Sequence, residues 1–355
     1  MAYTTITDPS AYFQTLLYSG NASTNVLTNS ANAGNVQPDW LWLKCRNDAV
    51  SHNVFDTSRQ TSGESTLVIR PNSAGTESNV SGDGMTSIDS NGFTLNGGGS
   101  GGGVNESGKT YVAWQWKANG GTTSSNSDGS ITSTVQANTT AGFSIVTYTG
   151  TGSAATIGHG LGAVPKIIIL KERSSNSSWQ VYHVGIGATK RLELNLTNAE
   201  TTTSGTWNDT TPTSSVFSIG TSGGVNENTQ TYVAYCFAEK QGYSKFGSYT
   251  GNGSADGMFI YTGFKPAWVM IKSTSLTQGW GIWDNKRTPL NLSNKILIAS
   301  SSTSELTGFG IDILSNGFKL RSTDANSNQS GATYIYMAFA QNPLVATNDV
   351  IALAR

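Results

Sequence analysis

Short apolar stretches separated by Gly, Asn, Ser and Thr recur along the whole chain, and this pattern predicts β-strands. Phe143–Tyr148 alternates imperfectly between apolar and polar residues, as in a strand of a sheet with one wetter face. Tyr111–Trp116 and Tyr232–Phe237 are rich in aromatic residues, which suits central strands against a packed core. No stretch keeps a helical apolar period over three turns. We therefore predict an all-β protein.

The same order of strand motifs occurs three times along the chain. Each copy opens with a Tyr-[Ser/Thr]-Gly turn, continues with an apolar run between a proline and a lysine, and closes with an aromatic strand that follows an asparagine by six residues. The opening turns begin at Tyr18, Tyr148 and Tyr249, the apolar runs are Pro38–Lys44, Pro165–Lys171 and Pro266–Lys272, and the closing pairs are Asn105 with Tyr111, Asn226 with Tyr232, and Asn328 with Tyr334.

Each copy has about 100 residues, the usual size of an independent domain. We therefore predict three tandem β-sandwich or jelly-roll-like repeats, each with its own core. The predicted division is an N-terminal arm (1–11), copy 1 (12–117), a Gly/Ser/Thr-rich linker (118–140), copy 2 (141–240), copy 3 (241–342) and a C-terminal tail (343–355).

The lengths of the connections suggest how the copies are arranged. The long linker predicts that copy 1 sits at a different angle, whereas copies 2 and 3, which are joined by few residues, are expected to pack as a unit. The tail is expected to lie across a neighbouring subunit of a homo-oligomer.

Composition and charge exclude several classes of function. Charged residues make up 12% of the chain and the net charge is −1, so no field attracts nucleic acid. No run of some 18 apolar residues predicts membrane insertion, and residues 1–10 lack the pattern of a signal peptide. We expect a soluble protein made in a cytoplasm. Cys45 and Cys236 lie in predicted strands of different copies, which favours two reduced core thiols.

An Asn-Gly-Phe motif in copies 1 and 3 predicts a tight turn before a strand, because both Asn and Gly tolerate a positive φ. The middle copy keeps only part of this motif, so a ligand site shared by all three copies is not expected. The residues of the motif are Asn91, Gly92 and Phe93 in copy 1, and Asn316, Gly317 and Phe318 in copy 3.

An aspartate and an arginine three residues apart follow the second apolar run in two copies. Asp56 with Arg59 and Asp284 with Arg287 predict a local ion pair or loop clamp, and a structural role is favoured over catalysis. In the middle copy, His183 replaces the aspartate and no arginine follows.

Several tryptophans occur in pairs, which has two interpretations. Two rings at i and i+2 of a strand share one face, where they either fill the core or form a platform for sugar rings, and core filling is the default. The loops between strands are the sites at which we expect glycan contacts, and the candidate residues are Trp179, Tyr182, Trp280 and Trp283.

No motif points to catalysis. His52, His159 and His183 are isolated, the chain contains neither Cys-x-x-Cys nor Gly-x-Ser-x-Gly, and no metal-ligand spacing or cofactor motif is present. A pair of carboxylates across a cleft, as in glycosidases, remains open from sequence. We predict a protein that is not an enzyme and holds no metal or cofactor.

The quoted Tyr-Thr-Gly turns, Pro-to-Lys strands, Ser-Asn-Gly-Phe turns and closing Tyr-[Val/Ile] strands resemble a repeated β-rich domain of bacteriophage virion proteins. This domain is common in phages of marine bacteria and cyanobacteria and is often labelled tail-fibre or structural. The resemblance implies a virion surface protein, tail-fibre-like or a tail accessory, that contacts other virion proteins and host-surface glycans. By analogy with phage fibres, it would be a homo-oligomer, for example a trimer. The alternatives are a capsid decoration or head-fibre protein, a polysaccharide depolymerase and a soluble lectin.

Overall fold

The computed structural model describes residues 4–29, 36–60, 67–80, 84–97 and 103–344. Strands dominate these residues, so the prediction of an all-β protein is confirmed. The helices among these residues are a 3-10 turn, η1 (Pro9–Ala11), and two single-turn helices, α1 (Ser204–Trp207) and α2 (Gly223–Asn226).

One order of antiparallel strands recurs in the three copies. The order is β1-β9-β3-β4 in copy 1, β12-β19-β14-β15 in copy 2 and β20-β27-β22-β23 in copy 3. We call these the central sheets. Their strands are β1 (Phe13–Ser19), β9 (Thr110–Trp116), β3 (Trp40–Cys45) and β4 (Asn53–Asp56); β12 (Phe143–Thr149), β19 (Thr231–Ala238), β14 (Pro165–Glu172) and β15 (Gln180–His183); β20 (Ser244–Thr250), β27 (Thr333–Pro343), β22 (Phe264–Ser273) and β23 (Gly281–Asp284).

Shorter strands cover the outer side of each central sheet or extend it. In copy 1 they are β2 (Asn25–Thr28), β5 (Leu67–Val68), β6 (Ser78–Asn79), β7 (Met85–Asp89) and β8 (Gly92–Leu95). In copy 2 they are β13 (Ala155–Gly158), β16 (Lys190–Glu193), β17 (Thr201–Thr202) and β18 (Val216–Ile219). In copy 3 they are β21 (Phe259–Tyr261), β24 (Ser293–Ile298), β25 (Leu306–Leu314) and β26 (Gly317–Leu320).

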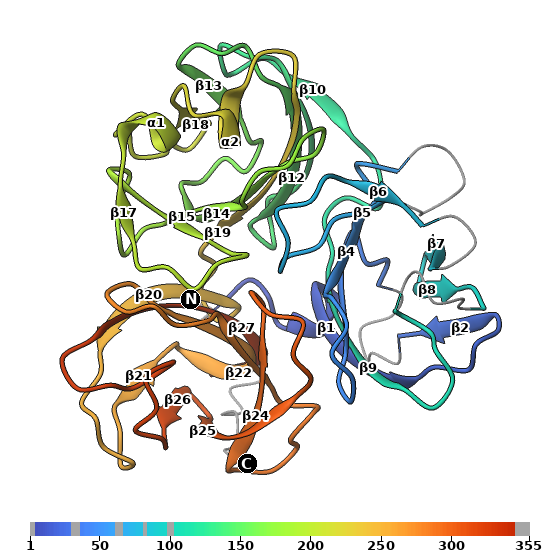
Figure 1. The fold of residues 1–355 in the computed structure, drawn as a ribbon, viewed down its shortest axis with the longest axis vertical. Helices are drawn as coiled ribbons and strands as arrows, with labels where there is room; N and C mark the ends of the chain where they lie inside the picture. The colour runs from blue at the N-terminus through green and yellow to red at the C-terminus, as the bar shows by residue number, and fades with distance from the viewer. Residues whose placement is uncertain (1–3, 30–35, 61–66, 81–83, 98–102, 345–355) are drawn as a thin grey trace.

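The three copies form three lobes around a common centre, coloured blue, green and orange in Figure 1. Each central sheet is buried on both faces. In β9, for example, Tyr111 and Ala113 belong to a core inside copy 1, whereas Trp114 and Trp116 belong to a cluster shared by all three copies. We call this shared cluster the central core; it also contains Tyr235 of copy 2 and Trp268, Phe339 and other residues of copy 3.

The shared core corrects the expected arrangement of the copies. Copy 1 does not sit apart from the other two, because Trp40 stacks on Tyr235 with ring centroids 4.7 Å apart, and Trp116 meets Trp268 at 5.5 Å. Strands buried on both faces also explain why the Pro-to-Lys runs are continuously apolar and do not alternate. The copies therefore have inner cores of their own but are not separate beads.

The linker expectation for residues 118–140 is also wrong. This segment contains β10 (Ser124–Asn126) and β11 (Ser133–Asn138), and β11 pairs antiparallel with β12, so that Gln136 lies opposite Ile145. The many small polar residues of this segment suggested a linker, but it forms a strand in which Val135 and Gln136 are buried. β11 therefore extends the central sheet of copy 2 beyond β12. The corresponding strands β1 and β20 are the edge strands of the other two central sheets, as far as the structure describes them.

The N-terminal arm is attached to copy 3. Ile6 is buried in the central core, and the hydroxyl of Thr4 donates a hydrogen bond of 2.6 Å to the carbonyl oxygen of Gln241. Most of the C-terminal tail, for which contact with a neighbouring subunit was predicted, lies outside the described residues.

The recurring asparagine closes each copy. The side-chain amide of Asn226 donates to the carbonyls of Ser153 and Gly220, at 2.5 and 3.0 Å, while its oxygen accepts from the N–H of Thr151 at 2.8 Å. Asn105 and Asn328 make the corresponding contacts in their own copies. One buried amide therefore holds the opening turn against the segment before the closing strand.

Candidate functional site

The four side chains predicted to contact glycans are buried. Their exposed fractions are 0% for Trp179, 1% for Tyr182, 1% for Trp280 and 0% for Trp283. Trp179 and Trp280 lie in the central core, and Tyr182 and Trp283 lie in the inner cores of copies 2 and 3. The prediction of a sugar platform at these residues is wrong, because a ring with no accessible surface cannot stack on a ligand.

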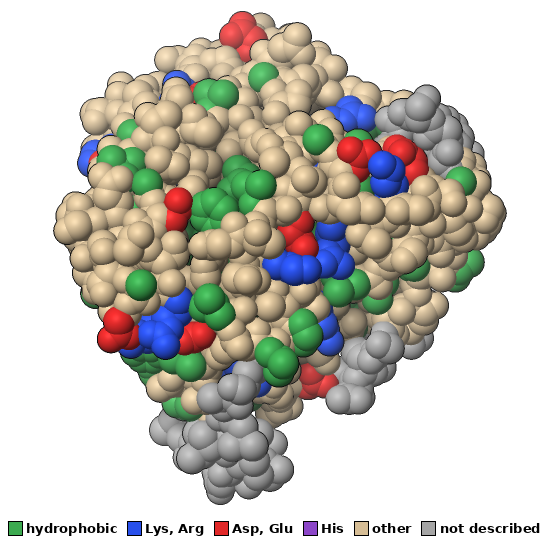
Figure 2. Space-filling view, turned by 60° about the horizontal axis from the view of Figure 1, so that its bottom comes forward, with side chains coloured by type: hydrophobic (Ala, Val, Ile, Leu, Met, Phe, Trp, Pro, Cys, Tyr) green, Lys and Arg blue, Asp and Glu red, His purple; other side chains and the backbone are tan. Residues whose placement is uncertain are grey.

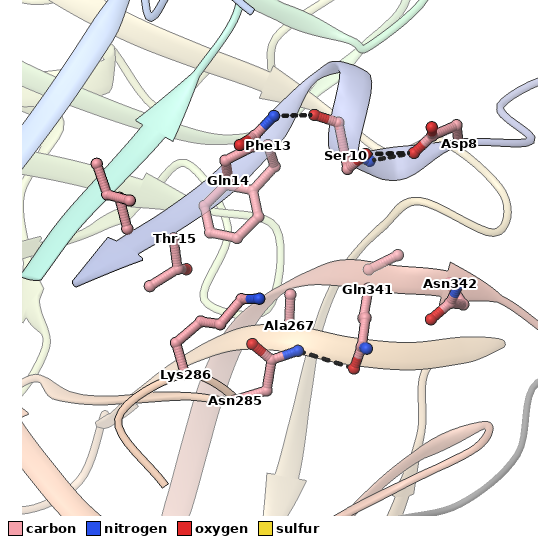
Figure 3. Close-up of a pocket in the computed structure, with 12 residues that line it drawn as sticks. Asp8, Ser10, Phe13, Gln14, Thr15, Ala267, Asn285, Lys286, Gln341 and Asn342 are labelled. Carbon is pink, nitrogen blue, oxygen red and sulfur yellow. Dashed lines mark hydrogen bonds between the residues drawn. The ribbon is translucent and has the colours of Figure 1, made fainter. Parts of the chain in front are cut away.

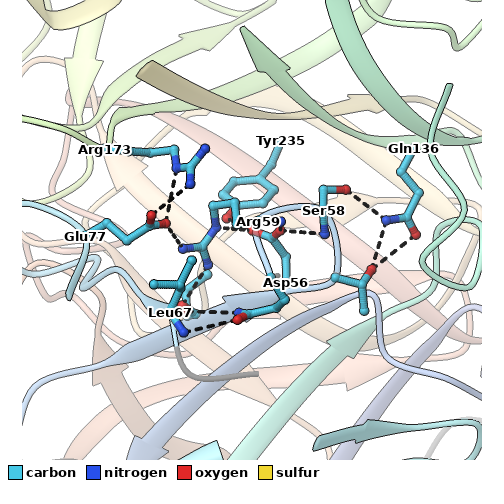
Figure 4. Close-up of polar contacts among 11 residues, drawn as sticks. Asp56, Ser58, Arg59, Leu67, Glu77, Gln136, Arg173 and Tyr235 are labelled. Carbon is cyan, nitrogen blue, oxygen red and sulfur yellow. Dashed lines mark hydrogen bonds and ion pairs between the residues drawn. The ribbon is translucent and has the colours of Figure 1, made fainter. Parts of the chain in front are cut away.

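The two Asp-Arg pairs lie beside the central core, and both form ion pairs. In copy 1, Asp56 accepts from Arg59, and Arg59 continues to Glu77 of the same copy, which in turn pairs with Arg173 of copy 2 at 2.8 Å (Figure 4). The hydroxyl of Tyr235, also from copy 2, donates to Asp56 at 2.6 Å. The pair is therefore part of the contact between copies 1 and 2.

Copy 3 builds the same network against copy 1. Arg287 pairs with Asp284 at 2.6 Å and with Glu305 at 3.3 Å, and Glu305 accepts from Arg46 of copy 1 at 3.1 Å. Trp114 of copy 1 donates its indole N–H to Asp284 at 3.0 Å. Although burial alone raises the pKa of Asp284, the Arg287 guanidinium and these hydrogen bonds hold it below its usual value.

A neutral histidine takes this place between copies 2 and 3. His183 Nδ1 accepts from the N–H of Gly185 at 2.9 Å, so Nε2 carries the proton and faces the carbonyl oxygen of Tyr336 at 3.2 Å. Burial lowers the pKa of His183 to about 4. The histidine is therefore uncharged at neutral pH and needs no arginine partner.

The lysines that end the Pro-to-Lys runs connect the copies in a ring. The ammonium of Lys44 donates to the carbonyl of Ser302 in copy 3 at 3.1 Å, Lys171 to Ala74 in copy 1 at 3.3 Å, and Lys272 to Thr197 in copy 2 at 3.1 Å. Burial lowers the pKa of each of these lysines to about 8.

The Asn-Gly-Phe turns are structural. A Cβ on Gly92 would lie 2.0 Å from the carbonyl oxygen of Leu27, and one on Gly317 would lie 2.1 Å from that of Ile260, so neither position accepts a side chain. The amide of Asn91 donates to the carbonyl of Asn29 at 3.1 Å. Phe93 and Phe318 are fully buried in the inner cores of their copies.

An open pocket of about 260 Å³ lies between copy 1 and copy 3 (Figure 3). Its walls are β1, with Phe13 and Thr15, and the turn after β23, with Asn285 and Lys286. Half of its lining residues carry a hydroxyl or amide side chain, and the carboxylate of Asp8 and the ammonium of Lys286 are the charged groups among them. We call this the β1 pocket. Sequence reasoning missed it because its two walls are more than 250 residues apart in the chain.

An exposed aromatic pair marks the outer side of copy 3. Phe259 and Tyr261 on β21 are 43% and 53% exposed, whereas Ile260 between them is buried. The equivalent strands β2 and β13 carry no aromatic residue. The visible surface in Figure 2 is mostly uncharged, with acidic and basic side chains in small mixed groups. The sequence signal for the pair was its i, i+2 spacing, the spacing shared by the buried tryptophans.

The described residues hold no group of three His, Cys, Asp or Glu side chains that could bind a metal ion. Their helices have four residues or fewer, and none could span a bilayer. Cys45 and Cys236 are both free thiols in buried strands.

Comparison with known proteins gives one family. No curated protein and no solved structure matches the chain. Residues 8–343 match a family described as a domain of unknown function (DUF7483). This match extends from the N-terminal arm to the end of β27 and includes all three copies, so the chain belongs to the DUF7483 family.

Proposed function

We propose that this chain is a non-enzymatic structural protein of a bacteriophage particle, exposed on the particle as a tail-fibre-like or tail accessory component. In this proposal its architecture is that of three tandem β-sandwiches of jelly-roll type closed around one centre. The virion role rests on the resemblance of the repeated motifs to phage virion domains. The non-enzymatic part rests on how the buried polar groups are used.

The observation that carries the proposal is the use of the charged groups between the copies. The pairs Asp56–Arg59 and Asp284–Arg287 face other copies of the same chain and are completed by them. Their carboxylates are fully buried and already accept several hydrogen bonds. An acid held in this way serves as a structural contact, since it has neither access to a substrate nor a free proton site.

Attachment to host-surface glycans is the activity that the surface supports best. Phe259 and Tyr261 present two aromatic rings on one face of β21, and aromatic faces are the groups on which sugar rings stack. A single shallow site of this kind binds weakly, so several chains on one particle would bind by avidity. The pair lies in copy 3 alone, so this copy would face the host.

Cryo-EM and mass spectrometry of phage particles purified from cells that express this chain test the virion role. Density at the tail with copy 3 outward is the expected result. Density on the capsid shell would instead identify a decoration protein and overturn the attachment role, and absence of the chain from purified particles would overturn both.

A direct binding measurement tests the attachment role separately. The double variant Phe259→Ser, Tyr261→Ser is expected to bind host cells at least about tenfold less than the unchanged protein, because the stacking surface is lost. The matched control, Val26→Ser on the equivalent strand β2, removes a residue that is 66% exposed and should bind normally. Equal binding by the double variant would exclude this surface.

A further inference from the structure

Of the strands that the structure describes, β11 in the contact between copies 1 and 2 has no equivalent in the other two contacts. β11 lies along β12, and Gln136 of β11 is fully buried where the turn after β4 approaches. Its amide donates to the hydroxyls of Thr57 and Ser58, each at 2.8 Å (Figure 4). Its oxygen accepts from the N–H of Asn119 at 3.1 Å. An amide side chain on an added strand thus completes this contact.

The β1 pocket is the corresponding place in the contact between copies 3 and 1. The strand registers align Asp56 with Asp284 and Trp116 with Phe339. Thr57, Ser58 and Asn119 therefore correspond to Asn285, Lys286 and Asn342, and all three of these residues line the β1 pocket. The space that Gln136 fills in one contact is open in the other.

Within the described part of the chain, β1, the strand beside the β1 pocket, is an edge strand. Lys117 N–H donates to the carbonyl of Tyr12 and Gly20 N–H to that of Lys109, so the even-numbered residues of β1 bond to β9. By the alternation of an antiparallel ladder, the backbone groups of Phe13, Thr15 and Leu17 point to the other side. Among the described residues, no strand pairs with β1 on that side.

Two side chains on this edge also lack the cover that their counterparts have. The hydroxyl oxygen of Thr15 is buried and has no hydrogen-bond partner among the residues that the structure describes, and Figure 3 shows Thr15 beside the pocket. Leu17 is 36% exposed. The matching residues on β12 are Ile145, which is fully buried, and Thr147, and β11 pairs with both. An added strand would cover Leu17 and could supply a partner for the Thr15 hydroxyl.

We propose that the β1 edge and the β1 pocket together accept an extended strand of a partner protein, with a Gln or Asn side chain of that strand entering the pocket. The strand adds antiparallel to β1, as β11 adds to β12, and its backbone bonds to Phe13, Thr15 and Leu17. The pocket presents one acidic and one basic side chain, Asp8 and Lys286, so an uncharged strand fits best. This inference rests on strand order and pocket geometry and does not depend on the proposed virion role.

The first experiment uses a strand that the chain itself provides. A fluorescent peptide with the sequence of residues 131–139, which contains Gln136, is titrated into the full-length protein, and fluorescence anisotropy reports binding. We expect saturable binding, and about tenfold weaker binding by the same peptide with Gln136→Ala. No binding at millimolar peptide would overturn the proposal.

A pair of variants locates the binding site. Leu17→Pro removes an N–H that points away from β9, so the edge loses a donor while the sheet keeps its ladder, and we expect about tenfold weaker binding. Leu17→Thr introduces the residue found at the matching position of β12, Thr147, and keeps the N–H. This variant should therefore bind the peptide like the unchanged protein. Equal binding by the proline variant would exclude the β1 edge.

Hydrogen exchange of the unchanged protein gives a readout that does not depend on any variant. The peptide should slow exchange at the amides of Thr15 and Leu17, and leave those of Leu16 and Tyr18 unchanged, because even-numbered residues already bond to β9. Protection confined to other strands would overturn the site. Self-association that Leu17→Pro abolishes would show a second copy of this chain as the occupant, and would overturn the assignment to a partner protein.

Discussion

At the scale of single residues, the three contacts between copies place one of two kinds of buried polar group at the same position. Two of them bury an Asp-Arg pair that a residue of the next copy completes, and the third buries the neutral His183. Sequence spacing predicted both ion pairs, because residues three apart across a tight turn can meet. It could not predict that other copies complete them, since those partners are distant in the chain.

Removing one member of a buried Asp-Arg pair should lower the stability of the fold. For Asp284→Asn we expect the free energy of unfolding to fall by about 3–5 kcal/mol, because the buried Arg287 charge loses its counter-charge. Urea denaturation measures this change. The control Asp209→Asn alters an exposed aspartate and should change stability by less than about 0.5 kcal/mol. A similar small effect at Asp284 would mean that water or Glu305 compensates Arg287.

The neutral histidine predicts a loss of stability in acid. His183 has a pKa of about 4 in the folded chain, against about 6.5 when unfolded. Between these values the unfolded state binds more protons, so stability falls as the pH decreases from 6.5 to 4, by up to about 3 kcal/mol. His183→Gln should make the denaturation midpoint less dependent on pH in this window. An unchanged dependence would assign the acid effect to other groups.

At the scale of elements, the sequence predicted the strands but not which of their faces are exposed. Aromatic residues at i and i+2 occur both in the buried Trp114–Trp116 pair and in the exposed Phe259–Tyr261 pair, so spacing alone cannot separate core from surface. The strand β11 was missed for a different reason. Its Ser, Thr and Asn residues have the composition of a linker, and only its pairing with β12 reveals its role.

A single side chain tests the role of β11. Gln136→Ala should lower the free energy of unfolding by about 2 kcal/mol, because the N–H of Asn119 loses a buried acceptor and two hydroxyls lose a donor. Thermal or urea denaturation measures the change. Ser125→Ala, on the exposed strand β10, is the matched control and should be nearly neutral. Equal stability of the two variants would make β11 a passive cover.

At the scale of the whole molecule, the central core makes the three copies depend on one another. The sequence predicted three copies of domain size, and each does have an inner core. The sequence could not reveal that the second face of every central sheet packs against the other two copies. A strand that is buried on both faces has the same apolar pattern whichever element covers it.

We therefore expect the chain to unfold in one cooperative transition. Calorimetry should give a ratio of calorimetric to van't Hoff enthalpy of about 1, because loss of one copy exposes the aromatic faces of the other two. Three separate transitions would contradict the shared core.

The shared core also predicts the behaviour of a single copy. Residues 241–344 alone should bind hydrophobic dyes strongly, because Trp268, Trp280 and Phe339 would face water.

The ring of contacts also has a consequence for how the protein is made. Lys44 and Arg46, near the start of the chain, are bonded to Ser302 and Glu305, separations of 258 and 259 residues. A ribosome releases the first copy long before these partners exist. The nascent chain must therefore hold its first two lobes with an aromatic face exposed until the last strands emerge, and closure of the circle is the final step of its biogenesis.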